Sequence, residues 1–257
     1  MQDQIVITTR PIDDAQQDIA DLKEMMITAL AAPMLEIQPL TTAAKPASSV
    51  DAIVVTSRHA PPLLDASLHH LPCYCVGGST ANAAHNAGFQ NVITGGGDGQ
   101  ALAKVIHDHQ QTADHPTKLD HVFWPSAVDT GFNIADALAA FDITTDRQPV
   151  YKAATTNHWP DDIDNAIRQG KVAAVLMHSG RAGEHFAKLM DARGLSPYRE
   201  NITAIVISNR AAGLCGGGWH NIKIAATPRR SAMFVAAAET LGLPASSINA
   251  ADLDQDL

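Results

Sequence analysis

The sequence contains one strand-to-helix pattern twice, and this repeat constrains the fold more than any other feature. In each copy an apolar run ends in a serine before a helical segment, and a second apolar run ends in small polar residues before another helix. The first copy spans Asp51 to Ile106 and the second spans Val172 to Ala238. The repeat predicts two related α/β lobes. Since open α/β sheets bind ligands beyond the carboxyl ends of their strands, we expect these edges to face one cleft.

Apolar runs alternate with helical patterns along most of the chain, which is typical of a parallel sheet covered on both faces. The segment after Tyr151 supplies too few strands for a complete lobe. We expect the missing strand to be Ile5 to Thr9, followed by a helix from Pro11 to about Leu30. The lobe that contains both termini is then discontinuous, and the middle of the chain is an inserted lobe.

The predicted fold class is therefore α/β, with two doubly wound parallel-sheet lobes joined by a two-stranded linker. We expect residues 1–35 and 153–257 to form the discontinuous lobe and residues 40–147 to form the inserted lobe. The linker strands are predicted at 34–40 and 147–153, where the sequence reads MLEIQPL and RQPVYKA.

Composition and charge narrow the class of protein. The chain has 257 residues, 46% of them hydrophobic, and a net charge of −9, which argues against nucleic-acid or membrane binding through bulk electrostatics. No apolar run approaches the ~20 residues of a membrane span, and the N-terminal residues do not resemble a signal peptide. The three cysteines form no disulfide framework. We expect a cytoplasmic monomer that acts on a small molecule.

Several polar residues at predicted strand ends are candidates for ligand binding. Ser57 and Ser179 can each cap a helix or hydrogen-bond a ligand, and neither lies in a nucleophile elbow. The turn that contains Gly77, Gly78 and Thr80 is either a tight turn or an anion cradle made of backbone N–H groups at a helix N-terminus.

Arg10 and Tyr151 are the other candidates. Arg10 ends the first predicted strand and could hold a carboxylate bidentately, or it could be a surface arginine. Tyr151 lies on a predicted linker, where it could overlook the cleft or pack. The twelve histidines show no metal-binding spacing, so we expect no metal. This set of residues favours an enzyme that positions a multiply charged substrate through backbone donors.

Seven segments, in order, resemble the uroporphyrinogen-III synthase family over nearly the whole chain: ITTRP, AIVVTSRHA, CVGGSTANAAHNAGF, VFWPS, PVYKA, AAVLMHSGRAGEHF and GWHNIKIAATP. The resemblance implies the two-lobed fold and a cyclising hydro-lyase of haem (porphyrin) biosynthesis that needs no cofactor. Its substrate would be hydroxymethylbilane, a linear tetrapyrrole, which loses water and closes with inversion of ring D. The family's proposed route passes through an azafulvene and a spiro-pyrrolenine.

The resemblance also implies roles for individual residues. Tyr151 occupies the position of the tyrosine suspected of assisting departure of the hydroxyl, and Thr80 resembles the threonine of the family's first lobe. The other substrate-binding candidates lie at cleft-facing positions of the family or in the turns that follow the strands: Arg10, Ser57, Gly77, Gly78, Ser179, Ser208 and Thr227. The Ser208 segment, VISNRAAGLC, departs from the VGGSTA form of the first lobe.

Two alternatives remain open from the sequence. One is a non-enzymatic two-lobe protein that closes on a small anion. The other is a sugar-phosphate or nucleotide enzyme that uses the turn from Gly77 to Thr80, although no metal-binding carboxylate set lies near that turn. A ligand screen separates these readings, because phosphate compounds should stabilise a sugar-phosphate or nucleotide enzyme, whereas tetrapyrroles should stabilise a uroporphyrinogen-III synthase.

Overall fold

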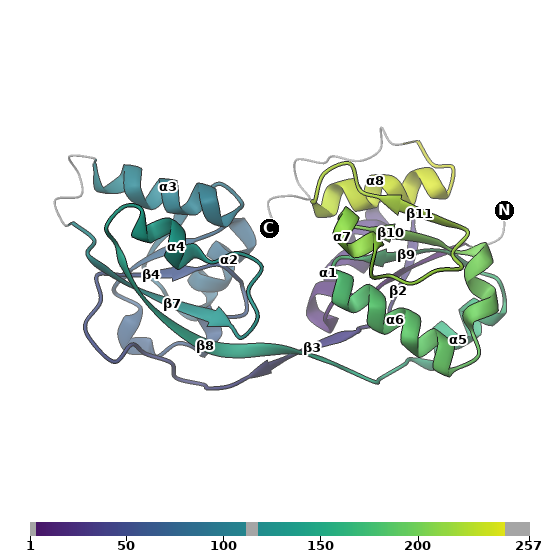
Figure 1. Cartoon of the computed structure of the whole chain (residues 1–257), viewed down its shortest axis with the longest axis horizontal. Coiled ribbons are helices and arrows are strands. Elements are labelled where there is room, and N and C mark those ends of the chain that lie inside the picture. Colours follow the sequence, from purple (N-terminus) through teal and green to yellow (C-terminus); the bar gives the residue numbers. More distant parts are fainter. Residues whose placement is uncertain (1–3, 112–117, 245–257) are drawn as a thin grey trace. The chain divides into compact units, whose positions relative to one another are not determined.

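The computed structural model describes residues 4–111 and 118–244 and divides them into two compact units (Figure 1). Lobe 1 comprises the described residues up to 36 together with those from 154 onward, and lobe 2 comprises those between 37 and 153. Each lobe has its own parallel sheet with helices on both faces.

The sheet of lobe 1 has five strands in the order β11-β10-β9-β1-β2, and the N-terminal strand β1 lies inside it. β1 pairs in parallel with β2 on one side and with β9 on the other. The strands are β1 (Ile5–Thr8), β2 (Thr28–Ala31), β9 (Val172–Met177), β10 (Thr203–Val206) and β11 (Asn221–Ile224). The prediction that the N-terminal strand completes this lobe is therefore confirmed.

The two faces of the lobe 1 sheet bury alternate residues of each strand, as the period of a strand requires. Val6 and Leu176 pack with α1 and α8, whereas Ile7 and Val175 pack with α5 and α6. The helices are α1 (Ile12–Glu24), α5 (Asp161–Arg168), α6 (Gly180–Ala192), α7 (Asn209–Ala212) and α8 (Arg230–Thr240), with the short 3-10 helix η3 (Ser196–Asn201).

The first helix is shorter than predicted. It ends at Glu24, and residues 28–31, which the helical spacing assigned to it, form strand β2. The physical reason is the turn at Met26, whose φ of 61° is left-handed and cannot continue a right-handed helix. Met26 is 88% exposed at this turn, while Ile27 and Ala29 return to the core.

The sheet of lobe 2 has six strands in the order β3-β8-β7-β4-β5-β6. The pairs from β8 to β6 are parallel. The strands are β3 (Leu35–Pro39), β4 (Ala52–Val55), β5 (Pro72–Cys75), β6 (Asn91–Thr94), β7 (His121–Ala127) and β8 (Thr144–Thr155). The chain leaves lobe 1 through β3 and returns to it through β8, so two neighbouring strands form the linker.

Helices cover both faces of the lobe 2 sheet. Ile53 and Cys73 pack with α2, whereas Val54 and Trp124 pack with α3 and α4. The helices are α2 (Gly78–Ala87), α3 (Gly99–Gln110), α4 (Ile134–Ala139) and the 3-10 helices η1 (Pro61–Leu63) and η2 (Ala66–Leu68). The segment after Ser57 was predicted to be helical, but it forms only these short turns, because paired prolines interrupt backbone hydrogen bonding there. The α/β fold class of two lobes is confirmed.

Candidate active site

A cavity of about 210 Å³ opens at the carboxyl ends of the strands of lobe 2. Its walls come from the residues that follow β4, β5 and β7, from the start of α3, and from β8. They are Thr56, Ser57, Val76, Gly99, Ala127, Asp129, Thr130, Gly131, Phe132 and Tyr151. This is the edge of a parallel α/β sheet at which ligands bind.

Tyr151 is the buried aromatic residue of this cavity, with 6% of its surface exposed. Strand pairing fixes its backbone, because the Val128 N–H donates a 2.9 Å hydrogen bond to the Tyr151 carbonyl. Burial raises the pKa of the Tyr151 phenol, and a hydrogen bond with Ser57 opposes that shift. The ring of His59 meets the tyrosine edge-on at 5.7 Å between centroids. The phenol therefore remains protonated near neutral pH.

Arg147 fixes the loop that follows β7. Its Nη2 donates to the carbonyls of Ala127 at 3.1 Å and Val128 at 2.9 Å, and its Nε donates to Ser126 Oγ at 3.0 Å. The same guanidinium lies over the ring of Trp124, 5.1 Å from the centroid. These contacts hold the first residues of the loop in place.

The other two contacts that shape the cavity involve aromatic side chains. Trp124 donates through Nε1 to Thr56 Oγ1 at 3.1 Å, which fixes the polar residue that follows β4. Phe132 packs so closely on Gly99 that a Cβ at that glycine would lie 2.2 Å from Phe132 Cδ1. Phe132 is nevertheless 42% exposed, so it presents an aromatic surface at the cavity rim.

The N-terminus of α2 adjoins the cavity, because Val76 lines the wall and Gly77 is the N-cap. Gly77 has no side chain to accept from the first-turn N–H groups, and no side chain caps this helix. By contrast, Asp98 caps α3 by accepting from the Ala101 N–H at 2.8 Å. Thr80 is only 3% exposed, so in this turn the first-turn backbone N–H groups, and not the Thr80 side chain, are the donors that α2 leaves without a side-chain cap.

The predicted residues of lobe 1 also follow strand ends. Ser179 caps α6, accepting from the Ala182 N–H at 3.1 Å, and Ser208 caps α7, accepting from the Ala211 N–H at 3.3 Å. Thr227 is exposed after β11. Each capping serine retains its hydroxyl proton for donation, so the two roles considered for Ser179 are compatible.

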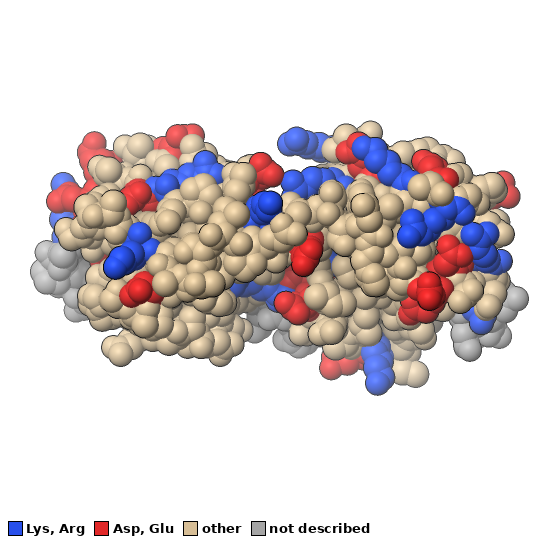
Figure 2. All heavy atoms as spheres, turned by 90° about the horizontal axis from the view of Figure 1, so that it is seen from below, with Lys and Arg blue, Asp and Glu red and all other residues tan. Residues whose placement is uncertain are grey.

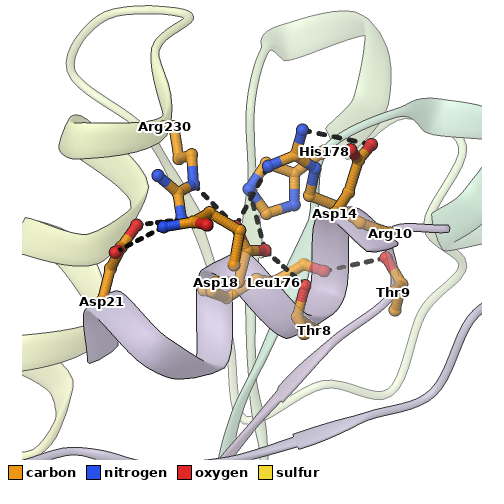
Figure 3. Close-up of polar contacts among 10 residues, drawn as sticks. Thr8, Thr9, Arg10, Asp14, Asp18, Asp21, Leu176, His178 and Arg230 are labelled. Carbon is orange, nitrogen blue, oxygen red and sulfur yellow. Dashed lines mark hydrogen bonds and ion pairs between the residues drawn. The ribbon is translucent and has the colours of Figure 1, made fainter. Parts of the chain in front are cut away.

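Arg10 belongs to a buried ionic cluster at the carboxyl ends of β1 and β9 (Figure 3). Its guanidinium lies 3.2 Å from Asp14 and donates to Asp18 at 3.0 Å, and its side chain is 19% exposed. Burial lowers the pKa of Arg10, and the attraction of Asp18 opposes that effect. Arg10 thus already has two carboxylate partners, and its contact with substrate stays a prediction.

Asp18 is the centre of this cluster and is fully buried. It accepts from Thr8 Oγ1 at 2.6 Å, from Arg10 at 3.0 Å and from Arg230 Nε at 2.7 Å. Burial alone would raise the pKa of Asp18, but the positive charges and hydrogen bonds around it hold the pKa below its ordinary value. Arg230, from α8, also pairs with Asp21.

His178 follows β9 and completes the cluster, with Nε2 3.8 Å from Asp18 and 13% of its side chain exposed. Both ring nitrogens are buried without a hydrogen-bond partner. Burial lowers the pKa of His178 to about 3, Asp18 opposes the shift, and Arg10 and Arg230 reinforce it. The imidazole is therefore neutral near pH 7.

The structure brings Ser57 and Tyr151 together at one cavity, with Gly77 and Gly78 next to it. It also contributes three residues that the sequence analysis did not select: Asp129, Phe132 and Arg147. Asp129 and Phe132 closely follow the buried run VFWPSA, so their position after a strand end was the available signal. Among the described residues, no group of three or more His, Cys, Asp or Glu could hold a metal ion.

The fold and the cavity define a class: two-lobed α/β proteins that bind ligands at the carboxyl ends of parallel strands. A family model described as uroporphyrinogen-III synthase HemD matches residues 16–235. The chain belongs to the uroporphyrinogen-III synthase family. It is a cyclising hydro-lyase of haem biosynthesis, which converts hydroxymethylbilane with loss of water and inversion of ring D. The two alternatives kept open from the sequence are not favoured.

Solved structures were compared with this chain at the level of the fold. A uroporphyrinogen-III synthetase from Helicobacter pylori shares the fold and is 17% identical, with 92% of this chain and 99% of that chain covered and a TM-score of 0.60. A mutant uroporphyrinogen III synthase from the extremely thermophilic bacterium Thermus thermophilus is 13% identical, with 93% and 99% covered and a TM-score of 0.49. A search of curated proteins found no match to this chain.

Proposed function

We propose that the lobe 2 cavity binds the ring of hydroxymethylbilane that carries the hydroxymethyl group and that Tyr151 is the catalytic residue there. The observation that carries this proposal is the buried phenol of Tyr151, which shares the cavity wall with Ser57. The cavity of about 210 Å³ is smaller than the roughly 300–1,000 Å³ of pockets that enclose a drug-sized ligand. It therefore suits one pyrrole ring, while the rest of the tetrapyrrole lies outside it.

Tyr151 would act on the leaving hydroxyl. When the C–O bond of the hydroxymethyl group at one end of the bilane breaks, the electron pair stays on oxygen, and that oxygen needs a proton to depart as water. The buried phenol is protonated and donates a hydrogen bond to this oxygen, and Ser57 orients it. Because burial raises the phenol pKa, the contribution is a hydrogen bond that strengthens as charge develops, and it is modest in size.

The acetate and propionate arms would be held by backbone amides. The first turn of α2, at Gly77, Gly78 and Thr80, directs N–H groups without a side-chain cap at the rim of the cavity. A helix N-terminus favours anions through these donors and its dipole. We assign further carboxylate contacts to the hydroxyls of Ser179, Ser208 and Thr227, and a lesser one to Arg10, which already has two carboxylate partners.

We also propose that the protein works in the cytoplasm as a monomer, without nucleic acid or membrane. The net charge of −9 supports this, and so does Figure 2, where Lys and Arg side chains are interspersed with Asp and Glu on the face shown. The three cysteines are free and buried, as expected in a reducing compartment. No helix in the described part of the chain has the length and apolarity to span a bilayer.

The test supplies the purified protein with freshly made hydroxymethylbilane and resolves the product isomers. Formation of the type I isomer alone, at the uncatalysed rate, would reject the function. Tyr151→Phe should lower turnover by roughly 10- to 100-fold, the low end of a general-acid contribution. The matched control is Tyr74→Phe, because Tyr74 is also a buried tyrosine of lobe 2 but bonds His109 at 2.8 Å, outside the cavity. Unchanged turnover of Tyr151→Phe would remove the role of Tyr151 and leave the function standing.

A further inference from the structure

We infer that Asp129 is a second catalytic residue, whose carboxylate accepts the pyrrole N–H of the ring that carries the hydroxymethyl group and stabilises the cation formed on that ring when the hydroxyl departs. The inference rests on the proposed binding of this ring in the lobe 2 cavity. Of the described residues that line this cavity, Asp129 alone carries a carboxylate.

Strand pairing connects Asp129 to Tyr151. Ala127, at the end of β7, pairs with Tyr151 on β8, and the next residue, Val128, donates its N–H to the Tyr151 carbonyl at 2.9 Å. Asp129 follows directly. In a cavity of only about 210 Å³ that both residues line, a ring that occupies the space lies close to both of them.

The loop that carries Asp129 is fixed on both sides of it. Arg147 binds the carbonyls of Ala127 and Val128 before Asp129, and Phe132 packs on Gly99 after it. A charge held by fixed backbone stabilises a transition state without the cost of reorganisation. This distinguishes Asp129 from a carboxylate on a freely moving surface loop.

The chemistry of the reaction gives this carboxylate a role that Tyr151 cannot fill. As the C–O bond breaks, its electron pair leaves with the oxygen, which departs as water after taking a proton. The lone pair of the pyrrole nitrogen moves into the ring and leaves a positive charge shared with the N–H group. Tyr151 acts on the leaving oxygen, and Asp129 acts on the nitrogen, through a charge-assisted hydrogen bond that is strongest in the cation.

The substrate is itself negatively charged. Hydroxymethylbilane carries acetate and propionate arms, so a carboxylate in its binding site repels the ground state. A group that weakens substrate binding but stabilises the cation affects the two kinetic constants differently. Removing the charge of Asp129 should therefore lower kcat while leaving KM unchanged or lower. A merely structural or binding role does not give this pattern.

The experiment compares Asp129→Asn with Asp136→Asn, an exposed carboxylate of the same lobe that lies outside the cavity. We expect Asp129→Asn to lose about 10²-fold in kcat without a rise in KM, as for removal of one preorganised electrostatic partner. Asp136→Asn should behave as the parent, and Asp129→Glu, which keeps the charge, should recover part of the loss. Far-UV circular dichroism checks that each variant is folded.

Two results would overturn the inference: Asp129→Asn with the parent's kcat, or equal losses in Asp129→Asn and Asp136→Asn. If Asp129→Asn is inactive through misfolding, the comparison is made between Asp129→Glu and Asp129→Gln. The inference then requires a higher kcat for Asp129→Glu, and equal kcat values would show that the charge has no role. Failure of the proposed function is separable, because it would appear as absence of the type III isomer from the parent protein and as no loss in Tyr151→Phe.

Discussion

His178 should make lobe 1 lose stability as the pH falls below 6.5. In the folded protein, burial lowers the pKa of His178 from 6.5 to about 3, while the groups that face it are Asp18 from α1, Arg10 after β1 and Arg230 from α8. Since the folded pKa is below the unfolded one, the unfolded chain takes up the proton first, and stability declines between these two pH values. Each pH unit in this window is worth about 1.4 kcal/mol, so the loss from pH 6.5 to 5 is about 2 kcal/mol.

Replacing the imidazole with an apolar group should remove this dependence. Both ring nitrogens lack a hydrogen-bond partner, so His178→Leu breaks no hydrogen bond and should have nearly the parent's stability at pH 7.5. At pH 5 the variant should be about 2 kcal/mol more stable than the parent. This is a large share of the roughly 5–15 kcal/mol that stabilises a domain.

The assay is urea unfolding at pH 7.5, 6.5 and 5, followed by the fluorescence of Trp159 and Trp219, which both lie in lobe 1. His220→Gln is the control, because His220 is an exposed histidine of the same lobe. The reasoning is refuted if His178→Leu and the parent lose equal stability between pH 6.5 and 5, or if His220→Gln flattens the curve as much.

Three further predictions concern other parts of the chain. Asp18→Asn should destabilise lobe 1 by about 3–5 kcal/mol in urea unfolding, because it leaves Arg10 and Arg230 without their shared buried carboxylate. A loss below about 1 kcal/mol would contradict this expectation. Gly99→Ala should displace Phe132 from the cavity rim, raising KM for hydroxymethylbilane while thermal unfolding shifts little. Gly217→Ala serves for comparison, because a Cβ there also meets nothing within 4 Å and Gly217 does not line the cavity. The three thiols should resist a disulfide reagent at pH 8 in the native protein and should all react in denaturant, because they are buried and burial raises the pKa of Cys215. Fast labelling of the native protein would contradict the burial of these cysteines.

The sequence predicted the parts of the fold that follow from periodicity and from strand accounting. The strand at Ile5 to Thr9 could be assigned to the lobe formed by the C-terminal part of the chain, because the second copy of the repeat needed one more strand. The error at residues 28–31 arose because TALA has no strong strand preference, and its conformation depends on the left-handed turn at Met26 and on pairing with β1.

The candidate site was predictable only in part, for a related reason. Ser57 and Tyr151 were found because they lie in segments with a recognisable pattern. Asp129 and Arg147 were not, because their importance depends on which strands are neighbours: β7 and β8 place Arg147 beside the loop that carries Asp129. Likewise, the cluster around Asp18 could not be foreseen, because Arg230 from α8 and His178 after β9 reach this carboxylate from far along the chain.

The placement of β1 inside the lobe 1 sheet has a consequence for synthesis on the ribosome. β1 pairs with β2 and with β9, and β9 begins only at Val172, so β1 and β2 leave the ribosome long before the second of these partners exists. Lobe 2, which is encoded between them, can complete its own sheet during that interval. Lobe 1 can be completed only after lobe 2, because Arg230 of α8 donates to Asp18, which lies 212 residues earlier in the chain. Until β9 is made, β1 can pair with β2 but not with β9, so lobe 1 is incomplete at a stage when every strand of lobe 2 has been made.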